Sequence, residues 1–150
     1  MGEYERSIPE TTISEEQANI IEEFSFFEDW MDRYQYLIDI GRKLPLMPEE
    51  YLRDEFKLKG CQSQVWFVGE AVGERLIFRA SSDAAIVAGL IAILLRIYSN
   101  RTPEEILSAS PSFVKDLGLE EHLSPTRKNG LGAMLNSIMQ RAELGFNQTA

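Results

Sequence analysis

Residues 64–98 read QVWFVGEAVGERLIFRASSDAAIVAGLIAILLRIY, and this stretch decides the fold. It begins with β-branched and aromatic side chains over 64–68, which predict a strand. Two glycines within 69–74 predict a turn, and residues 75–80 repeat the strand pattern. Apolar side chains then continue almost without interruption from Ala84 to Tyr98, which predicts a helix buried across one face of the sheet.

A third strand is predicted just before this stretch. Residues 56–58 alternate between apolar and polar side chains, and residues 60–63 have the composition of a turn. Joined to the two strands at 64–68 and 75–80, they predict a three-stranded antiparallel meander. Cys61 then lies in the first connection of that meander.

Helical patterns flank the meander on both sides. Ser14 and Gln17 form a capping-box pattern, and Ser82 with Asp83 precede the apolar helix as candidate caps. Helices are predicted from Ser14, over 27–44, from Thr102, over 111–117 and from Ser124 onward. The sequence therefore predicts an α+β fold, in which a small three-stranded antiparallel sheet packs against several helices.

The composition excludes several classes of protein. Of the 150 residues, 44% are hydrophobic and 26% are charged, as in globular chains that fold without disulfides. The net charge is −9, whereas nucleic-acid-binding surfaces are basic, so we expect no nucleic-acid partner. Residues 1–55 carry 15 acidic and 5 basic side chains, but residues 56–150 carry 9 and 10. The acidic third is interpreted first as solvated helix surface; alternatively, the neutral remainder contacts another protein.

The length fits a single domain over 1–150, with loose ends at 1–13 and 144–150. The N-terminal residues lack the apolar core of a secretory signal. The longest apolar run, 84–95, is shorter than the roughly 20 residues that cross a bilayer. Cys61 is the only cysteine, so no internal disulfide forms. These features predict a cytoplasmic protein without a membrane partner.

The sequence contains no recognisable metal or phosphate motif. His122 is the only histidine, which rules out an HExxH zinc site, and glycine-rich phosphate loops are absent. We therefore expect no metal and no cofactor bound to this chain. His122 could pair with Cys61 as a catalytic base, but a structural position near the start of the last helix is the favoured interpretation.

Cys61 is the strongest candidate for chemistry. A lone cysteine is commonly a small buried apolar residue, and that interpretation stays open. A predicted turn between strands, however, is where a fold presents reactive groups. Lys57 and Lys59 lie close in sequence and favour the thiolate, which is the nucleophilic form of the side chain. Cys61 is therefore a candidate nucleophile whose electrophile these features do not identify.

The residues around Cys61 resemble the signature of a known family. Residues 60–66, Gly-Cys-Gln-Ser-Gln-Val-Trp, are similar to the cysteine motif of the SufE family, the sulfur acceptors of cysteine desulfurases. Further segments agree in the same order within 29–45, 82–91 and 122–134. The cysteine heptapeptide combined with Ser-Pro-Thr-Arg at 124–127 is specific. One departure is Phe56, where the family commonly carries an asparagine, so the hydrogen bonding before the loop is expected to differ.

The resemblance implies a SufE/IscU-like fold and a role in sulfur transfer. A SufS-like cysteine desulfurase, using its own pyridoxal phosphate, holds sulfur as a persulfide. The SufE-like protein takes that sulfur on its cysteine, here Cys61, stimulates the desulfurase and delivers the sulfur to a SufB-like iron–sulfur scaffold. Family members hold this cysteine at a loop tip within an apolar cavity and swing it toward the partner. The chain is thus expected to be a carrier and activator rather than an enzyme.

The resemblance also implies roles for four further residues. Gln62 and Ser63 flank the acceptor and are expected to shape its loop. Asp83 and Arg127 match family positions associated with desulfurase contact or with the state of that loop. Asp83 also fits a helix cap, with or without a partner contact. Arg127 lies in the first turn of the last helix, where a cation opposes the helix dipole, so a tertiary or functional partner is expected.

Two other functions remain open from the sequence. A thiol redox sensor would have Cys61 oxidised to sulfenic acid by peroxide without any partner. A non-catalytic adaptor would bind the desulfurase without using Cys61. Within the family, residues 62–64 favour the SufE branch, which serves iron–sulfur assembly, over the paralogous CsdE branch.

Overall fold

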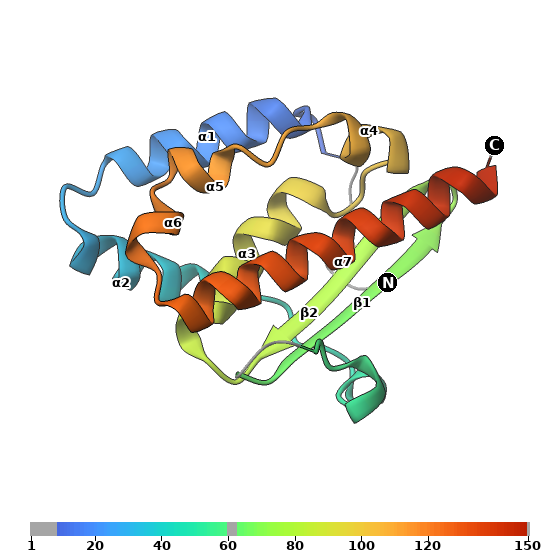
Figure 1. Ribbon diagram of the computed structural model, residues 1–150, viewed down its shortest axis with the longest axis horizontal. Helices are drawn as coiled ribbons and strands as arrows, with labels where there is room; N and C mark the ends of the chain where they lie inside the picture. The colour runs from blue at the N-terminus through green and yellow to red at the C-terminus, as the bar shows by residue number, and fades with distance from the viewer. Residues whose placement is uncertain (1–8, 60–62, 150) are drawn as a thin grey trace.

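The computed structural model describes residues 9–59 and 63–149. Within them, seven α-helices surround a two-stranded antiparallel sheet (Figure 1). In chain order the elements are α1 (Ile13–Ser25), α2 (Trp30–Arg42), the 3-10 helices η2 (Glu49–Tyr51) and η3 (Asp54–Phe56), β1 (Val65–Val72), β2 (Arg75–Ser82), α3 (Ala85–Tyr98), α4 (Pro103–Ser108), α5 (Phe113–Asp116), α6 (Leu119–His122) and α7 (Pro125–Thr149). The α+β class expected from the sequence is confirmed.

The sheet has two strands in the described residues instead of the predicted three. β1 and β2 pair from Val65–Ser82 to Val72–Arg75, and Gly73 turns the hairpin with a φ of +63°. The segment expected to be the first strand, 56–58, instead ends a 3-10 turn and forms one bridge, between Lys57 and Trp66. The prediction of a third strand was wrong, because η3 leaves too few extended residues for a ladder.

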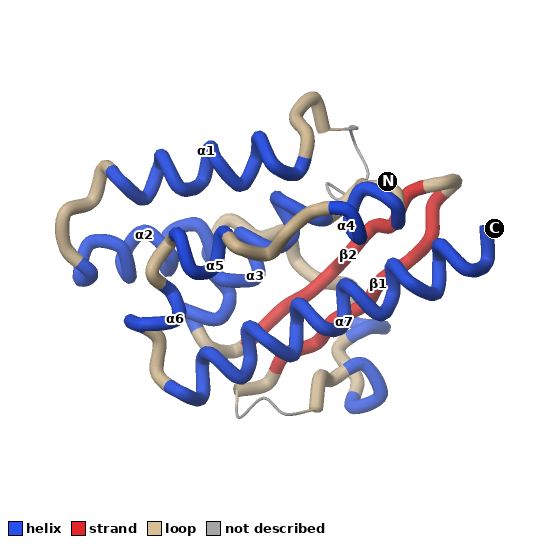
Figure 2. The backbone as a smooth tube through the Cα atoms, turned by 45° about the horizontal axis from the view of Figure 1, so that its top comes forward, coloured by secondary structure: helices blue, strands red, loops and turns tan. Residues whose placement is uncertain are grey.

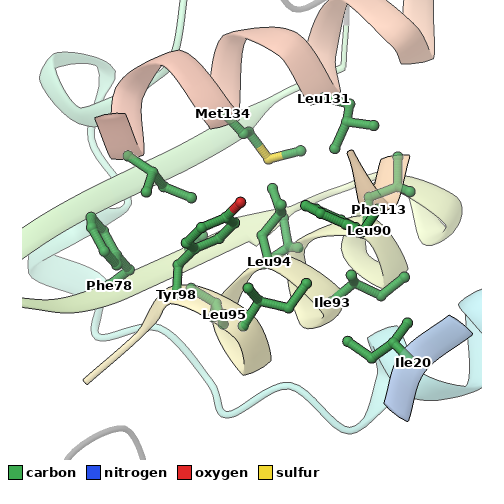
Figure 3. Packing of buried hydrophobic residues seen from close by; sticks show 14 of the residues in the cluster. Ile20, Phe78, Leu90, Ile93, Leu94, Leu95, Tyr98, Phe113, Leu131 and Met134 are labelled. Atoms are coloured by element: carbon green, nitrogen blue, oxygen red, sulfur yellow. The ribbon is translucent and has the colours of Figure 1, made fainter. Parts of the chain in front are cut away.

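The core lies between the hairpin and the helices α3 and α7. Both helices run beside the strands in the two views (Figures 1 and 2), and the buried cluster draws on all four elements. Leu131 and Met134 of α7 face Leu94 and Tyr98 of α3 (Figure 3). Nearly every residue of α3 from Val87 onward is at least half-buried, so the predicted burial of the apolar helix is confirmed.

Near the two ends of the described residues, α1 begins at Ile13 and α7 ends at Thr149. The α1 cap is Thr12, which forms a capping box with Glu15, so the box predicted at Ser14 was wrong. Ile13 is buried, and the buried guanidinium of Arg101 donates to the Thr11 carbonyl. At the other end, α7 continues through 144–149. The loose ends expected at 1–13 and 144–150 stay a prediction, and residues 1–8 lie outside the described residues.

Helices α2 and α3 cross at a pair of glycines. A Cβ added to Gly89 would lie 2.2 Å from the Leu37 carbonyl oxygen, and one added to Gly41 would lie 2.6 Å from the Gly89 nitrogen. Both distances are shorter than non-bonded contacts allow. The two backbones therefore approach as closely as they do only because neither position carries a side chain.

Glu23 ties α1 to α3 and α2. Its carboxylate accepts hydrogen bonds from Arg96 Nη1 at 2.9 Å and Nη2 at 2.5 Å, and from Tyr36 Oη at 2.5 Å. The bonds from Arg96 hold the pKa of Glu23 below its ordinary value of 4.5. Burial, together with the Glu23 carboxylate, raises the pKa of Tyr36 to about 12.

Glu23→Gln is therefore expected to lower the free energy of unfolding by about 1 kcal/mol at neutral pH, since the pair is partly solvent-screened. A depressed folded pKa stabilises the protein above the ordinary pKa, and this stabilisation is lost as pH falls through the folded value. The difference from wild type should consequently shrink below pH 4.5. Urea unfolding of variant and wild type from neutral pH to below pH 4.5 measures this difference, with Glu22→Gln as the exposed control. A difference that stays constant with pH contradicts the assignment.

Candidate functional site

The loop that carries Cys61 is held at its base by backbone pairing. Leu58 N–H donates to the Val65 carbonyl at 2.9 Å, and the Lys57–Trp66 bridge lies just behind it. The chain therefore enters and leaves the loop side by side, where β1 begins and β2 ends (Figure 1). Ser63 forms a half-buried bend on the way out. Residues 60–62 lie outside the described residues, so the expectations for Cys61 and Gln62 stay predictions.

Asp83 fixes the outgoing side of this loop. Its Oδ1 accepts from the Gln64 backbone N–H at 3.1 Å, and its Oδ2 accepts from Gln64 Nε2 at 3.4 Å. In return, Asp83 N–H donates to the Gln64 carbonyl at 3.4 Å. The pair thus extends the ladder by one position beyond Val65–Ser82. Gln64 follows Cys61 by three residues, so Asp83 holds the backbone three positions beyond Cys61.

Asp83 is not the cap of α3, as the sequence allowed. The N-cap is Ala84, which makes no side-chain capping bond, and the Ala84 N–H instead bonds to Ser82 Oγ at 3.1 Å. Strand β2 runs on to Ser82, and this directs the Asp83 carboxylate across to Gln64. The helix-cap interpretation of Asp83 was therefore wrong, whereas a role in the loop stays a prediction.

The two lysines near the loop have different surroundings. Lys57 Nζ lies 3.1 Å from Asp54 Oδ1 and 5.5 Å from the centre of the Trp66 ring. Asp54 therefore offsets much of its charge. Lys59 is exposed and forms no ion pair with a described residue. Of the two cations expected to favour the Cys61 thiolate, Lys59 is the one without a competing carboxylate.

Arg127 lies in the first turn of α7, and this turn is at the same end of the molecule as the loop base (Figures 1 and 2). Its backbone N–H donates to Ser124 Oγ at 3.3 Å, and its side chain is half-buried. The guanidinium makes no ion pair or hydrogen bond with a side chain in the described ranges. The partner expected for this cation is therefore not among those residues.

His122 has structural contacts. Its ring stacks on Trp30, with 4.1 Å between ring centres, and its Nδ1 lies 3.0 Å from the Gly118 carbonyl. Tyr34 Oη donates to the His122 carbonyl, which ties α2 to the end of α6. These contacts account for His122 without a catalytic role, in line with the favoured interpretation.

Neither a metal site nor a membrane span is found in the part of the chain that the structure describes. No three or more His, Cys, Asp or Glu side chains in that part are grouped so as to hold a metal ion. Within the same residues, no helix combines the length and the apolar character needed to cross a bilayer. At the end of the molecule that carries the loop base, the described features that bear on function are therefore that base and the side chains around it.

Comparison with known proteins decides the family. A family model described as SufE, Fe-S metabolism associated domain, matches residues 18–142, which include the cysteine motif and both flanking elements. The chain belongs to the SufE family. The family resemblance seen in the sequence is confirmed, and with it the link to iron–sulfur metabolism.

Two relatives agree with this assignment to the SufE family, and a solved structure has a similar fold. An uncharacterized SufE-like protein of Rhizobium meliloti is 46% identical over 130 residues, covering 83% of this chain and 92% of the relative. One from Rhizobium etli is 44% identical over 131 residues, covering 83% and 88%. The solution structure of a hypothetical protein from Thermus thermophilus matches with a TM-score of 0.72 and 22% identity, covering 88% of this chain and 96% of that one. The last match supports the fold alone.

Loss of the Asp83 carboxylate is expected to free the Gln64 backbone. Asp83→Ala should increase the hydrogen-exchange rate of the Gln64 amide about tenfold, because a bond to a charged acceptor contributes about 1.5 kcal/mol. Asp83→Asn should keep most of the protection, since its amide oxygen can still accept from that N–H. Amide exchange followed by NMR distinguishes the variants. Equal protection of Gln64 in Asp83→Ala and wild type contradicts the bond.

Proposed function

We propose that this protein accepts sulfur from a pyridoxal-phosphate-dependent, SufS-like cysteine desulfurase onto Cys61, stimulates that enzyme, and passes the sulfur to a SufB-like iron–sulfur scaffold. The observation that carries the proposal is the SufE family match over 18–142, which contains the only cysteine of the chain within the family's motif. A lone thiol suits this role, because a second cysteine nearby could expel the sulfur by forming a disulfide.

The transfer itself is a thiol–persulfide exchange. The Cys61 thiolate attacks the outer sulfur of the desulfurase persulfide, and a new S–S bond forms on Cys61. The S–S bond on the desulfurase breaks, and its cysteine leaves as a thiolate. One persulfide replaces another, so the step consumes no oxidant or reductant. Cys61 is covalently modified and then discharged, which makes the chain a carrier without independent turnover.

The described residues support a loop whose two sides are fixed at its base. Pairing of Leu58 with Val65 and of Asp83 with Gln64 holds the two sides. We propose that Lys59, exposed and without a competing carboxylate among the described residues, supplies positive charge that favours the thiolate form of Cys61. We propose that Gln62 and Ser63 shape the tip between these points. We propose that Arg127 contacts the partner or the loop.

Two further parts of the proposal concern place and cofactors. Exchange of this kind needs a free thiol, so we propose that the protein works in a reducing compartment, the cytoplasm. The chemistry needs neither metal nor cofactor on this chain, because the pyridoxal phosphate belongs to the desulfurase.

Alanine release by the desulfurase tests the proposal. Without added reductant, each turnover leaves a persulfide that has to be removed before the next. Adding this protein with L-cysteine should raise the rate of alanine release several-fold, with saturation as the protein concentration increases. An unchanged rate over the whole concentration range, with every cysteine desulfurase of the organism, contradicts the proposal.

A further inference from the structure

A groove of about 640 Å³ lies between α7 and the short helices α5 and α6. Its floor is apolar and is made by side chains from all three helices. The apolar lining residues are Pro111, Val114, Leu119, Leu131 and Leu135. Apolar side chains gathered in a concave surface between helices are typical of sites that receive an amphipathic helix.

Charges of opposite sign border the groove. Glu120 and Glu121 stand on the α6 side, and Lys128 stands on the α7 side. All three are exposed, and none forms an ion pair with another described residue. These borders match a helix with Lys or Arg along one edge of its apolar face and an acidic residue along the other.

Gly132 adds a feature that the fold itself does not require. It lines the groove from α7, and a Cβ built on it meets no atom within 4 Å. Glycine destabilises a helix relative to alanine, and elsewhere in this chain helical glycines permit close contacts, as Gly89 does. At Gly132 no described neighbour makes that contact. The missing side chain deepens the groove and leaves the α7 backbone open to an incoming surface.

We infer that this groove docks an amphipathic helix of the cysteine desulfurase, with basic residues of that helix facing Glu120 and Glu121. The inference rests on the proposed function. A stable complex buries about 1,200–2,000 Å² of surface, so the desulfurase is expected to contact more than the residues around Cys61. Lys128 follows Arg127 in the first turn of α7, so the groove opens next to the end that carries the loop. One partner can therefore reach both.

Filling the groove tests the inference. The Cβ of Gly132→Leu meets no described atom within 4 Å, and leucine favours a helix more than glycine does, so the variant should fold and be at least as heat-stable as wild type. Its Kd for the pyridoxal-phosphate-loaded desulfurase, measured by calorimetry, should rise at least about tenfold. Gln140→Leu is the control, because it adds the same side chain to an exposed position of α7 outside the groove. It should leave the Kd within about twofold.

A second pair of variants separates the local charge from the net charge. Glu120→Lys with Glu121→Lys should raise the Kd about tenfold and weaken its dependence on salt. Glu104→Lys with Glu143→Lys makes the same change of net charge at exposed positions elsewhere, and should have a much smaller effect. If Gly132→Leu fails to fold, the comparison between these two charge-reversal variants still tests the inference.

The outcomes distinguish the groove from the sulfur chemistry. At saturating concentration, Gly132→Leu should still gain one sulfur atom on Cys61. A wild-type protein that no desulfurase loads overturns the proposed function, and the inference falls with it. Normal loading with an unchanged Kd for the groove variants overturns the groove alone. A change only in self-association, followed by sedimentation, would assign the groove to a second copy and equally overturn the inference.

Discussion

Cys61→Ser is expected to return alanine release to the rate of the desulfurase alone. A serine hydroxyl does not ionise near neutral pH and cannot hold a persulfide, so the variant accepts no sulfur. The loss should be complete at every concentration, because no other cysteine in the chain can substitute for Cys61. The measurement is alanine release with L-cysteine in the absence of reductant, carried out on variant and wild type in parallel.

The control for this variant is Ser108→Ala, which changes an exposed serine of α4 away from the loop base (Figure 1) and keeps the thiol. It should retain most of the stimulation. Full stimulation by Cys61→Ser would instead identify a non-catalytic adaptor. A protein that stimulates nothing, but whose Cys61 reacts readily with peroxide, would be the thiol redox sensor that the sequence also allows.

Gly89→Ala is expected to cause the largest loss of stability, about 3 kcal/mol or more in the free energy of unfolding. The added Cβ would lie 2.2 Å from the Leu37 carbonyl oxygen and 2.6 Å from its carbon. These are backbone atoms, so α2 as a whole has to move to relieve the overlap. The helix propensity gained by replacing glycine, about 1 kcal/mol, is too small to offset this cost.

The control is Gly132→Ala, the same substitution in another helix. Nothing lies within 4 Å of its added Cβ, so the variant should be more stable than wild type by up to about 1 kcal/mol. Urea unfolding of both proteins gives the comparison. If Gly89→Ala were as stable as wild type, α2 and α3 could not cross as closely as the structure shows.

The sequence predicts the parts of the fold that depend on local pattern. The strands at 64–68 and 75–80, the apolar helix from Ala84 and the helix from Thr102 all appear, each with a long or specific signal. The third strand fails because three alternating residues at 56–58 carry little information. Whether these residues pair depends on where η3 places the chain relative to β1, and the tertiary structure decides that placement.

The helix N-caps likewise cannot be predicted from the local sequence pattern alone. Ser14–Gln17 and Thr12–Glu15 both satisfy the capping-box spacing, and the choice between them depends on which frame buries Ile13 and Ile20. Asp83 has the residue type of a cap, but strand pairing positions it opposite Gln64 instead. Side-chain chemistry alone does not choose between a helix end and a neighbouring strand.

The site was predicted by motif more than by geometry. The signature around Cys61 identifies the family, yet nothing in it signals the bond between Asp83 and Gln64, which the hairpin brings together across 19 residues. The groove beside α7 has no signal either, since Gly132 has the same residue type as the packing glycine Gly89. Only the three-dimensional arrangement shows that one is buried in a helix crossing and the other is open.

The central claim is that Cys61 carries sulfur, and intact mass measures it most directly. The protein is mixed with a cysteine desulfurase and L-cysteine, and an alkylating reagent then traps the product. The account predicts a gain of one sulfur atom on wild type that is absent from Cys61→Ser. No gain with any desulfurase of the organism, under conditions in which each one turns over, would contradict it.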